Sequence, residues 1–441
     1  MSTTKISLDD KYTFERTRAY MTGIQALARL PILQHQRDLN AGLNTAGFIS
    51  GYRGSPLGGL DQTLWKVQTH LKSHNIVFQP GVNEELAATA VWGSQQVNLF
   101  EGAKYDGVFG MWYGKGPGVD RSMDAFKHAN AFGTSKHGGV LAIAGDDHAC
   151  VSSTLPHQSE HNFIGASIPV LNPGNAQEVL DYGIIGWQLS RYSGCWIALK
   201  AISENMDSGM PVDIDPSRVN IIIPQDFKLP EEGLNGRWPA SGLEQERILN
   251  KFRIYAARNF ARVNKLDKIV LDSDNPRFGI ITTGKSYFDV MQALEDLGID
   301  ENTRHGIGLR VLKVGMSWPL EPTATHEFAK GLKEILVVEE KRGVIEDQLT
   351  GQLYNWPVED RPLVVGEFDE QGNDLLTNLS ELTPAMVARV IASRIKGFYA
   401  GQLIQDRLAF LETKEQSLAN SGSLVRQPYY CSGCPHNTST K

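Results

Sequence analysis

The chain has 441 residues, of which 41% are hydrophobic and 21% charged, the composition of a globular protein with two or three domains. Its formal net charge of -7 argues against a nucleic-acid partner, and no apolar run approaches the ~18 residues that span a bilayer. The N-terminal residues lack the apolar core of a signal peptide, and the four cysteines lack disulfide-framework spacing, so we expect a cytoplasmic protein.

Residues 15–215 are predicted to form the first domain, because strand-like and helix-like segments alternate along them. The predicted strands include residues 45–51, 107–112 and 139–144, and the predicted helices include residues 83–99 and 176–190. This alternation predicts an α/β fold with a doubly wound parallel sheet. Such sheets bind ligands at the carboxyl ends of their strands, which is where the unusual loops YRGSPLGG, GVNEE, YGKGPG and GDDHACVSS fall.

The remainder of the chain is predicted to hold a connector at 216–274, a second α/β domain at 275–400, and a polar linker at 401–426. The connector is rich in Pro and Gly and includes a basic helix from about residue 244 to 263. The predicted strands of the second domain are 278–282, 309–314 and 334–338, and its last predicted helix is 384–399.

The C-terminal residues 427–441 contain a Cys-x-x-Cys-Pro-His motif, CSGCPH. Cys431 and Cys434 could bind one metal ion or one iron of an iron–sulfur cluster, although a closed site takes about four ligands. The other two cysteines lie far upstream in apolar segments. We therefore expect half of a metal site at the start of a truncated domain, and a chain that is the front part of a longer polypeptide. A structural zinc ribbon is the alternative.

Two acidic residues, Glu84 and Glu85, occupy the first turn of the predicted helix after the cap Asn83. Acidic side chains there stabilise a helix by roughly 0.3–1 kcal/mol, which is the simplest explanation for both. The glycine-rich loops beside Glu84 favour a functional role as well. One interpretation of Ser55 is a helix cap. The chain contains no Walker motif and no G-x-G-x-x-G motif, which are the usual glycine-rich phosphate-binding sequences.

The loop GDDHACVSS places Asp146, Asp147 and His148 at a strand end. A carboxylate-rich metal site is one interpretation, but the spacing specifies no metal, so turn and cap roles are favoured. His157, Glu160 and His161 are candidate ligands that we expect instead to line a cleft or to lie in solvent.

Six motifs in order resemble the bacterial fused form of indolepyruvate ferredoxin oxidoreductase, within the thiamine-diphosphate-dependent 2-oxoacid:ferredoxin oxidoreductases. The resemblance covers essentially the whole chain. The motifs are GYRGSPLGG at 51–59, NEELAATAVWGS at 83–94, DDHACVSS at 146–153, GIITTGKSY at 279–287, the strand patterns VLKVGMSWPL and ILVVEE, and CSGCPH at 431–436.

This resemblance implies that residues 15–215 bind the aminopyrimidine of thiamine diphosphate and that residues 275–400 form a transketolase C-terminal-like domain. Residues 427–441 would begin the domain that binds the diphosphate and Mg²⁺; the chain has no Gly-Asp-Gly motif for that task, so the Mg²⁺ ligands would lie outside it. Glu84 takes the position of the catalytic glutamate, whose carboxyl group activates the cofactor through the pyrimidine N1′. The implied cofactor-binding residues are Gly54, Ser55, Pro56, Asn83, Lys115 and Gly116.

The implied reaction is oxidative decarboxylation of an arylpyruvate to an acyl-coenzyme A, with ferredoxin as electron acceptor and Cys431 and Cys434 among the ligands of an iron–sulfur cluster. The implied partners are the 2-oxo acid, coenzyme A, ferredoxin, and either the missing C-terminal domains or a partner subunit; a homodimer is expected, because the thiamine site commonly lies between protomers. Two alternatives stay open: a non-oxidative thiamine-dependent decarboxylase, and a non-catalytic fragment that acts as an assembly module.

Overall fold

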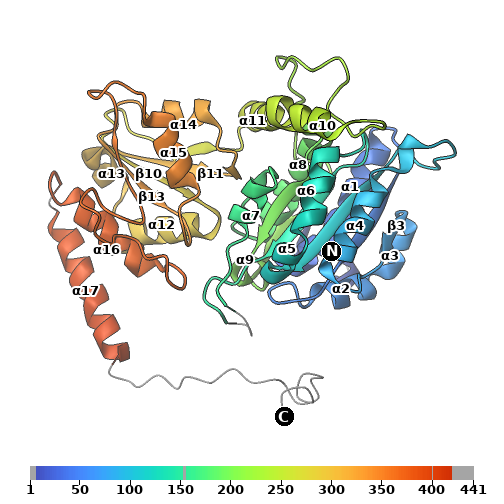
Figure 1. Cartoon of the computed structure of the whole chain (residues 1–441). Helices are drawn as coiled ribbons and strands as arrows, with labels where there is room; N and C mark the ends of the chain where they lie inside the picture. Colours follow the sequence, from blue (N-terminus) through green and yellow to red (C-terminus); the bar gives the residue numbers. More distant parts are fainter. Residues whose placement is uncertain (1–5, 152–154, 400, 420–441) are drawn as a thin grey trace, which may run out of the picture.

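The computed structural model describes residues 6–151, 155–399 and 401–419, which form two α/β domains side by side (Figure 1). Within these residues the first sheet has seven strands in the order β12-β6-β7-β5-β4-β2-β3. All of its neighbouring strands are parallel except β12, which runs antiparallel to β6. The strands are β2 (Thr45–Gly51), β3 (Ile76–Phe78), β4 (Gly107–Lys115), β5 (Val140–Gly145), β6 (Val170–Leu171), β7 (Ile197–Ala201) and β12 (Met316–Trp318).

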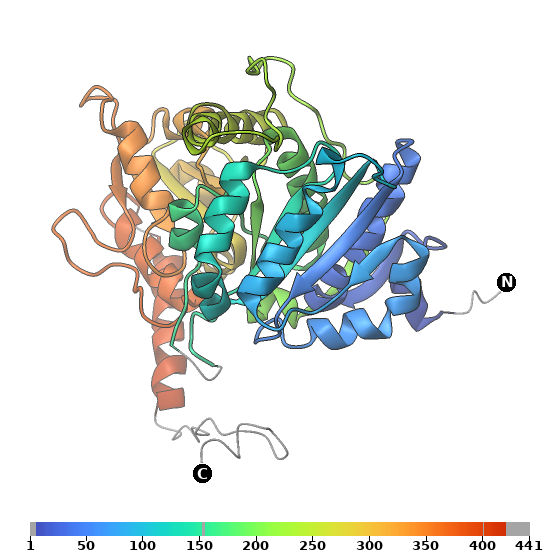
Figure 2. The same cartoon turned by 45° about the vertical axis from the view of Figure 1, so that its right-hand side comes forward.

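Helices cover both faces of the first sheet, as Figure 2 shows from a second direction. Alternate residues of β5 pack to opposite sides: Leu141 and Ile143 join the core beneath α1 and α8, whereas Ala142 and Ala144 join the core beneath α4 and α6. Burial on both faces explains why β5 is apolar throughout. The helices of this domain are α1 (Gly23–Asn40), α2 (Leu60–Lys66), α3 (Gln68–Ser73), α4 (Glu84–Ser94), α5 (Gly116–Arg121), α6 (Met123–Phe132), α7 (Glu160–Gly165), α8 (Ala176–Ser193) and α9 (Ser203–Met206).

A two-stranded antiparallel ribbon and a helical connector complete the first half of the chain. Strand β1 (Arg18–Thr22) pairs with β8 (Gly209–Asp213). The connector then forms α10 (Gly242–Ile248), a π-helical turn at Leu249–Arg253, and α11 (Ile254–Val263), which agrees with the basic helix expected there. Helix α11 packs on α8, so the connector belongs to the first core, which includes Ala257 and Phe260.

The second sheet has, within the described residues, five strands in the order β14-β13-β10-β11-β9. Its strands are β9 (Lys268–Leu271), β10 (Phe278–Thr283), β11 (Leu309–Val314), β13 (Glu334–Val338) and β14 (Leu363–Val365), and its helices are α12 (Gly284–Asp296), α13 (Glu301–Ile307), α14 (Pro322–Ala329), α15 (Ile345–Leu353), α16 (Pro384–Ile395) and α17 (Gln402–Ala419). Strand β9 is an antiparallel edge strand, so the sheet starts inside the stretch expected as connector.

The expected linker at 401–426 is corrected by the structure for residues 402–419, which form α17. Ile404 is only 4% exposed, and Leu408 and Leu411 pack against the same core. These apolar residues recur at helical spacing, which is typical of a helix that packs on a core. The rest of the segment is polar, so its overall composition suggested a linker.

The two domains share a strand. Although β12 follows β11 of the second sheet in the chain, it pairs with β6 at the edge of the first sheet. The amide of Asn172 donates to the Gly315 carbonyl at 3.1 Å, and Lys313 pairs with Glu178. The strand pairing, this backbone hydrogen bond and the ion pair attach the second domain to the first.

Candidate functional site

Glu84 begins α4 at the carboxyl edge of the first sheet. Asn83 is the N-cap, as the sequence predicted, and its side-chain oxygen accepts a hydrogen bond from the Leu86 amide at 2.9 Å. The indole of Trp112 donates to the Glu84 carbonyl at 2.9 Å, which ties this turn to β4. Glu84 is half-buried and Glu85 is exposed, so the two neighbouring acids have different surroundings.

Two glycines make room for the Glu84 side chain. A Cβ atom added at Gly118 on α5 would overlap Glu84 Cγ and would lie 2.8 Å from Glu84 Oε1. A Cβ at Gly114 on β4 would lie 3.4 Å from Glu84 Cγ. The motif YGKGPG therefore serves a steric purpose: its glycines form a surface against which the carboxyl group lies.

The loop after β2 closes the other side of this site. A Cβ at Gly54 would lie 2.8 Å from Lys115 Cβ, and a Cβ at Gly145 would lie 3.1 Å from Pro56 Cδ. Ser55 is exposed in this loop and does not cap α2, whose N-cap is Gly59. Burial lowers the pKa of Lys115, and the charges of Asp147 and Cys150 oppose this shift. The structure thus brings Gly54, Pro56, Lys115 and Gly116 to the edge where Glu84 lies.

The loop after β5 is held by hydrogen bonds within the protein. Asp146 accepts from the Ser159 amide at 2.9 Å and from the Ser159 hydroxyl at 2.6 Å, and Asp147 accepts from the Val151 amide at 3.0 Å. The Asp147 contact is the turn role that the sequence favoured, whereas Asp146 joins its loop to a residue 13 positions further along the chain. Ser152 and Ser153, the end of the DDHACVSS motif, lie outside the described residues.

No group of three or more His, Cys, Asp or Glu side chains in residues 6–151, 155–399 and 401–419 is placed to hold a metal ion. Cys431 and Cys434, the predicted metal ligands, lie outside these ranges. Of the other two cysteines, Cys195 is fully buried, and burial raises the pKa of its thiol to about 11.

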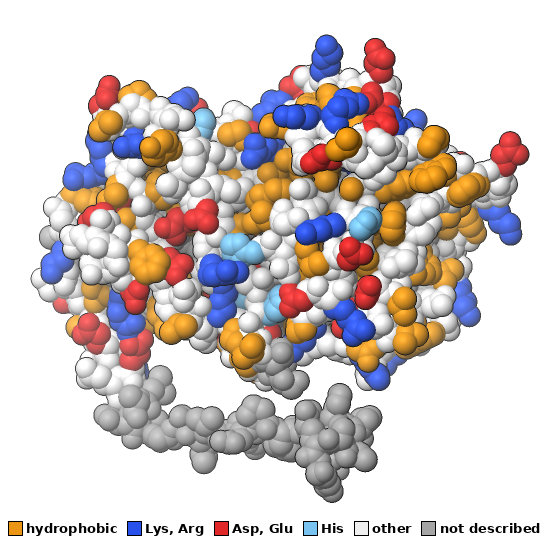
Figure 3. Space-filling view, in the orientation of Figure 1, with side chains coloured by type: hydrophobic (Ala, Val, Ile, Leu, Met, Phe, Trp, Pro, Cys, Tyr) orange, Lys and Arg blue, Asp and Glu red, His pale blue; other side chains and the backbone are white. Residues whose placement is uncertain are grey.

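Buried charges meet where the two domains join, which sequence reasoning missed. Lys200 pairs with Glu160 and lies 3.8 Å from Asp146, and these three side chains are at most 6% exposed. His148 lies 3.8 Å from Glu340 of the second domain. Figure 3 shows Lys, Arg and His side chains gathered along this junction. Glu160 was expected in a cleft or in solvent; instead, it is a buried ion-pair partner.

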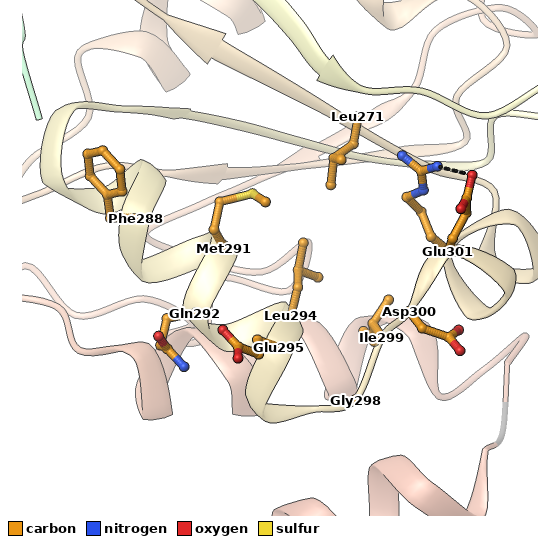
Figure 4. A pocket seen from close by; sticks show the side chains of 11 residues that line it. Leu271, Phe288, Met291, Gln292, Leu294, Glu295, Gly298, Ile299, Asp300 and Glu301 are labelled. Carbon is orange, nitrogen blue, oxygen red and sulfur yellow. Dashed lines mark ion pairs between the residues drawn. The ribbon is translucent and has the colours of Figure 1, made fainter. Parts of the chain in front are cut away.

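A groove of about 880 Å³ lies entirely within the second domain. Figure 4 shows Leu271, Met291 and Leu294 pointing into it, and the carboxylates of Glu295, Asp300 and Glu301 stand on its rim. None of its lining residues comes from the loops around Glu84, so this groove is separate from the candidate site.

Comparisons with known proteins find similar sequences and a similar fold. Residues 267–421 match the family described as indolepyruvate ferredoxin oxidoreductase middle domain. The indolepyruvate oxidoreductase subunit IorA of Methanothermobacter marburgensis is 23% identical over 409 residues, 92% of this chain and 59% of the relative. The IorA subunit of Pyrococcus abyssi is 23% identical over 423 residues, 92% of this chain and 58% of the relative. The chain therefore spans about three fifths of the length of these curated relatives.

A solved structure shares the fold: 2-oxoglutarate:ferredoxin oxidoreductase from Magnetococcus marinus, with a TM-score of 0.62 and 16% identity over 86% of this chain and 66% of that one. The arrangement of the two α/β domains is therefore shared with this 2-oxoacid oxidoreductase structure. The chain is thus similar to indolepyruvate oxidoreductase subunits over most of its length, and its second domain matches the middle-domain family.

None of the described helices is both long and apolar enough to cross a membrane.

Proposed function

We propose that this chain carries the pyrimidine-binding part of an enzyme that oxidatively decarboxylates arylpyruvates of the indolepyruvate type. One carbon–carbon bond of the 2-oxo acid breaks, CO₂ leaves, the acyl group forms a thioester with coenzyme A, and two electrons pass to ferredoxin. The observation that carries the proposal is the position of Glu84, which lies at the carboxyl ends of the strands of the first sheet and against Gly118 of α5. The similar proteins are indolepyruvate oxidoreductase subunits.

The residues around Glu84 fit the aminopyrimidine of thiamine diphosphate. Gly114 leaves room for the Trp112 ring, and Gly118 leaves room for the Glu84 side chain, which enters from α4. The pyrimidine is proposed to lie beside that carboxyl group. When bound, thiamine diphosphate supplies the electron sink for decarboxylation. The task of Glu84 is to hold and exchange a proton at the pyrimidine N1′, and the task of Gly54, Ser55, Pro56, Asn83, Lys115 and Gly116 is to shape the pocket around the cofactor and the substrate carboxylate.

The other half of the site is proposed to come from a further domain or a partner subunit. This chain has no Gly-Asp-Gly motif, so the diphosphate and Mg²⁺ are assigned to residues outside it. Cys431 and Cys434 are proposed to be two of the ligands of an iron–sulfur cluster. We further propose a homodimeric, cytoplasmic assembly, in which this chain alone is inactive.

Replacing Gly118 with Ala should lower turnover of the assembled enzyme by about 10–100-fold, because the new methyl group would displace the Glu84 side chain. Initial rates of 2-oxo acid-dependent ferredoxin reduction measure this effect. Gly351→Ala is the matched control, since a Cβ there meets nothing within 4 Å. A Gly118→Ala enzyme with wild-type turnover would show that the carboxyl group need not lie against α5.

The proposed function is tested by following CO₂ release and ferredoxin reduction together, with the enzyme assembled from all its native chains and supplied with thiamine diphosphate, Mg²⁺ and coenzyme A. Indolepyruvate, phenylpyruvate, pyruvate and 2-oxoglutarate are compared. We expect the two aryl substrates to be preferred, with two ferredoxins reduced for each CO₂. Release of CO₂ without ferredoxin reduction would favour a non-oxidative decarboxylase, and the absence of both reactions would favour an assembly module.

A further inference from the structure

The short helix α5 lies between the side chains of Glu84 and His157, which come from distant segments of the chain. A Cβ at Gly118 would overlap Glu84, and a Cβ at Gly116 would overlap the imidazole ring of His157. Both glycines are buried, so each backbone segment is in direct contact with its neighbour. A movement of His157 is therefore transmitted through α5 to the surface on which the Glu84 carboxyl group lies.

Both ring nitrogens of His157 face carboxylates. Nδ1 lies 3.2 Å from Asp146 Oδ1, and Nε2 lies 3.0 Å from Asp120 Oδ2 on α5. The His157 side chain is 14% exposed, Asp146 is fully buried, and Asp120 is 55% exposed. Two carboxylate partners require two N–H donors, so the ring in this arrangement is an imidazolium. The ring thereby joins the strand-end loop of β5 to α5.

The charges around the ring favour this state. Burial alone would lower the pKa of His157, but the hydrogen bonds and charges of Asp146 and Asp120 outweigh it and raise the pKa above its ordinary value. Burial likewise opposes ionisation of Asp146, yet the His157 hydrogen bond and the charge of Lys200 hold the Asp146 pKa below its ordinary value. Lys341 and Arg342 of the second domain line the groove beside the ring, and their positive charges oppose this state, unlike the two carboxylates.

We propose that His157 is a positioning residue: clamped between Asp146 and Asp120, it fixes α5 so that Gly118 holds the Glu84 carboxyl group in its working orientation. This inference rests on the proposed function of Glu84. In this role the His157 imidazolium orients the site but contacts neither the substrate nor the cofactor.

The most direct test is Asp120→Asn. The Asp120 side chain is half-exposed and asparagine has nearly the same size, so the variant protein should fold normally. We expect kcat to fall on the order of 10-fold with little change in KM for the 2-oxo acid.

In the wild type, kcat should be lost as the pH rises through the His157 pKa, because deprotonation removes one of the two N–H donors of the ring. In Asp120→Asn that loss should move to lower pH. NMR titration of histidine-labelled protein gives an independent measure, a lower His157 pKa in the variant.

Asp124→Asn is the matched control, since Asp124 is 87% exposed on α6 and should leave kcat, the pH profile and the His157 titration unchanged. His157→Gln, which keeps a single hydrogen-bonding group, should lower kcat and abolish the alkaline loss. The inference is overturned if Asp120→Asn shifts the His157 titration but leaves kcat and its pH profile at wild-type values, or if both Asp variants lose activity equally. A fully active Glu84→Gln enzyme would instead refute the proposed function, so the two failures are distinguishable.

Discussion

Replacing Glu84 with Gln should lower turnover of the assembled enzyme by roughly 10²–10⁴-fold, the usual contribution of a positioned acid–base group. The amide has nearly the size of the carboxyl group and can still lie against Gly118, but it cannot exchange a proton with the pyrimidine N1′. The fold should be little affected, because Asn83 caps α4 and an acidic first-turn residue contributes only about 0.3–1 kcal/mol. Initial-rate kinetics and thermal unfolding of the same preparation measure the two effects separately.

Glu85→Gln is the matched control for this substitution. Glu85 occupies the same helical turn, carries the same charge and meets the same helix dipole, but its side chain is exposed. We expect this variant to retain wild-type turnover. If Glu84→Gln kept near-native turnover, or if the two variants lost activity to the same extent, Glu84 would not be the activating acid.

The largest loss of stability is expected for Lys200→Met, which should lower the free energy of unfolding by about 3–5 kcal/mol. Lys200 is 5% exposed and provides the cation between Glu160 and Asp146. Burial alone would lower the pKa of Lys200, but the charges of Glu160 and Asp146 raise it, so the ammonium group stays charged. A methionine of similar length fills the space but leaves the buried Glu160 carboxylate without its cation and Asp146 with His157 alone. Equilibrium urea unfolding measures the change.

The double variant Lys200→Met with Glu160→Gln separates this charge effect from a packing effect. Glu160→Gln removes the carboxylate charge that Lys200→Met leaves unpaired, so the double variant should be more stable than Lys200→Met alone. Equal stability of the single and double variants would mean that packing explains the loss. A Lys200→Met protein within about 1 kcal/mol of wild type would contradict the importance of this cluster altogether.

Several parts of the fold were predictable because they depend on short stretches of sequence. Strands 45–51, 309–314 and 334–338 are found with the predicted bounds, since each is an apolar run between turn residues. Asn83 caps α4 because its short polar side chain reaches the third residue of the helix. Other bounds differ: α4 ends at Ser94 instead of Leu99, and β4 continues to Lys115 instead of Trp112.

The candidate site was predictable only in part. The family resemblance indicated Glu84, and the alternation of strands and helices indicated the loops around it, since parallel strands bring their carboxyl ends to one edge. The steric reason for the YGKGPG glycines was not apparent, because it depends on which side chains approach α5 from residues 84 and 157. The residues next to a histidine or lysine in the sequence do not indicate which side chains it contacts in the folded protein.

By itself, the sequence determined the α/β class, the order of the motifs and the N-cap of α4, all of which follow from local patterns of a few residues. Only the tertiary structure decided that β12 crosses to the first sheet, that Lys200 lies between Glu160 and Asp146, and that His157 lies between Asp146 and Asp120. The physical reason is that buried charges are placed by desolvation and by partners far along the chain: His157 and Asp146 are 11 residues apart, and Lys200 and Glu160 are 40 residues apart. No periodicity along the chain records such pairings.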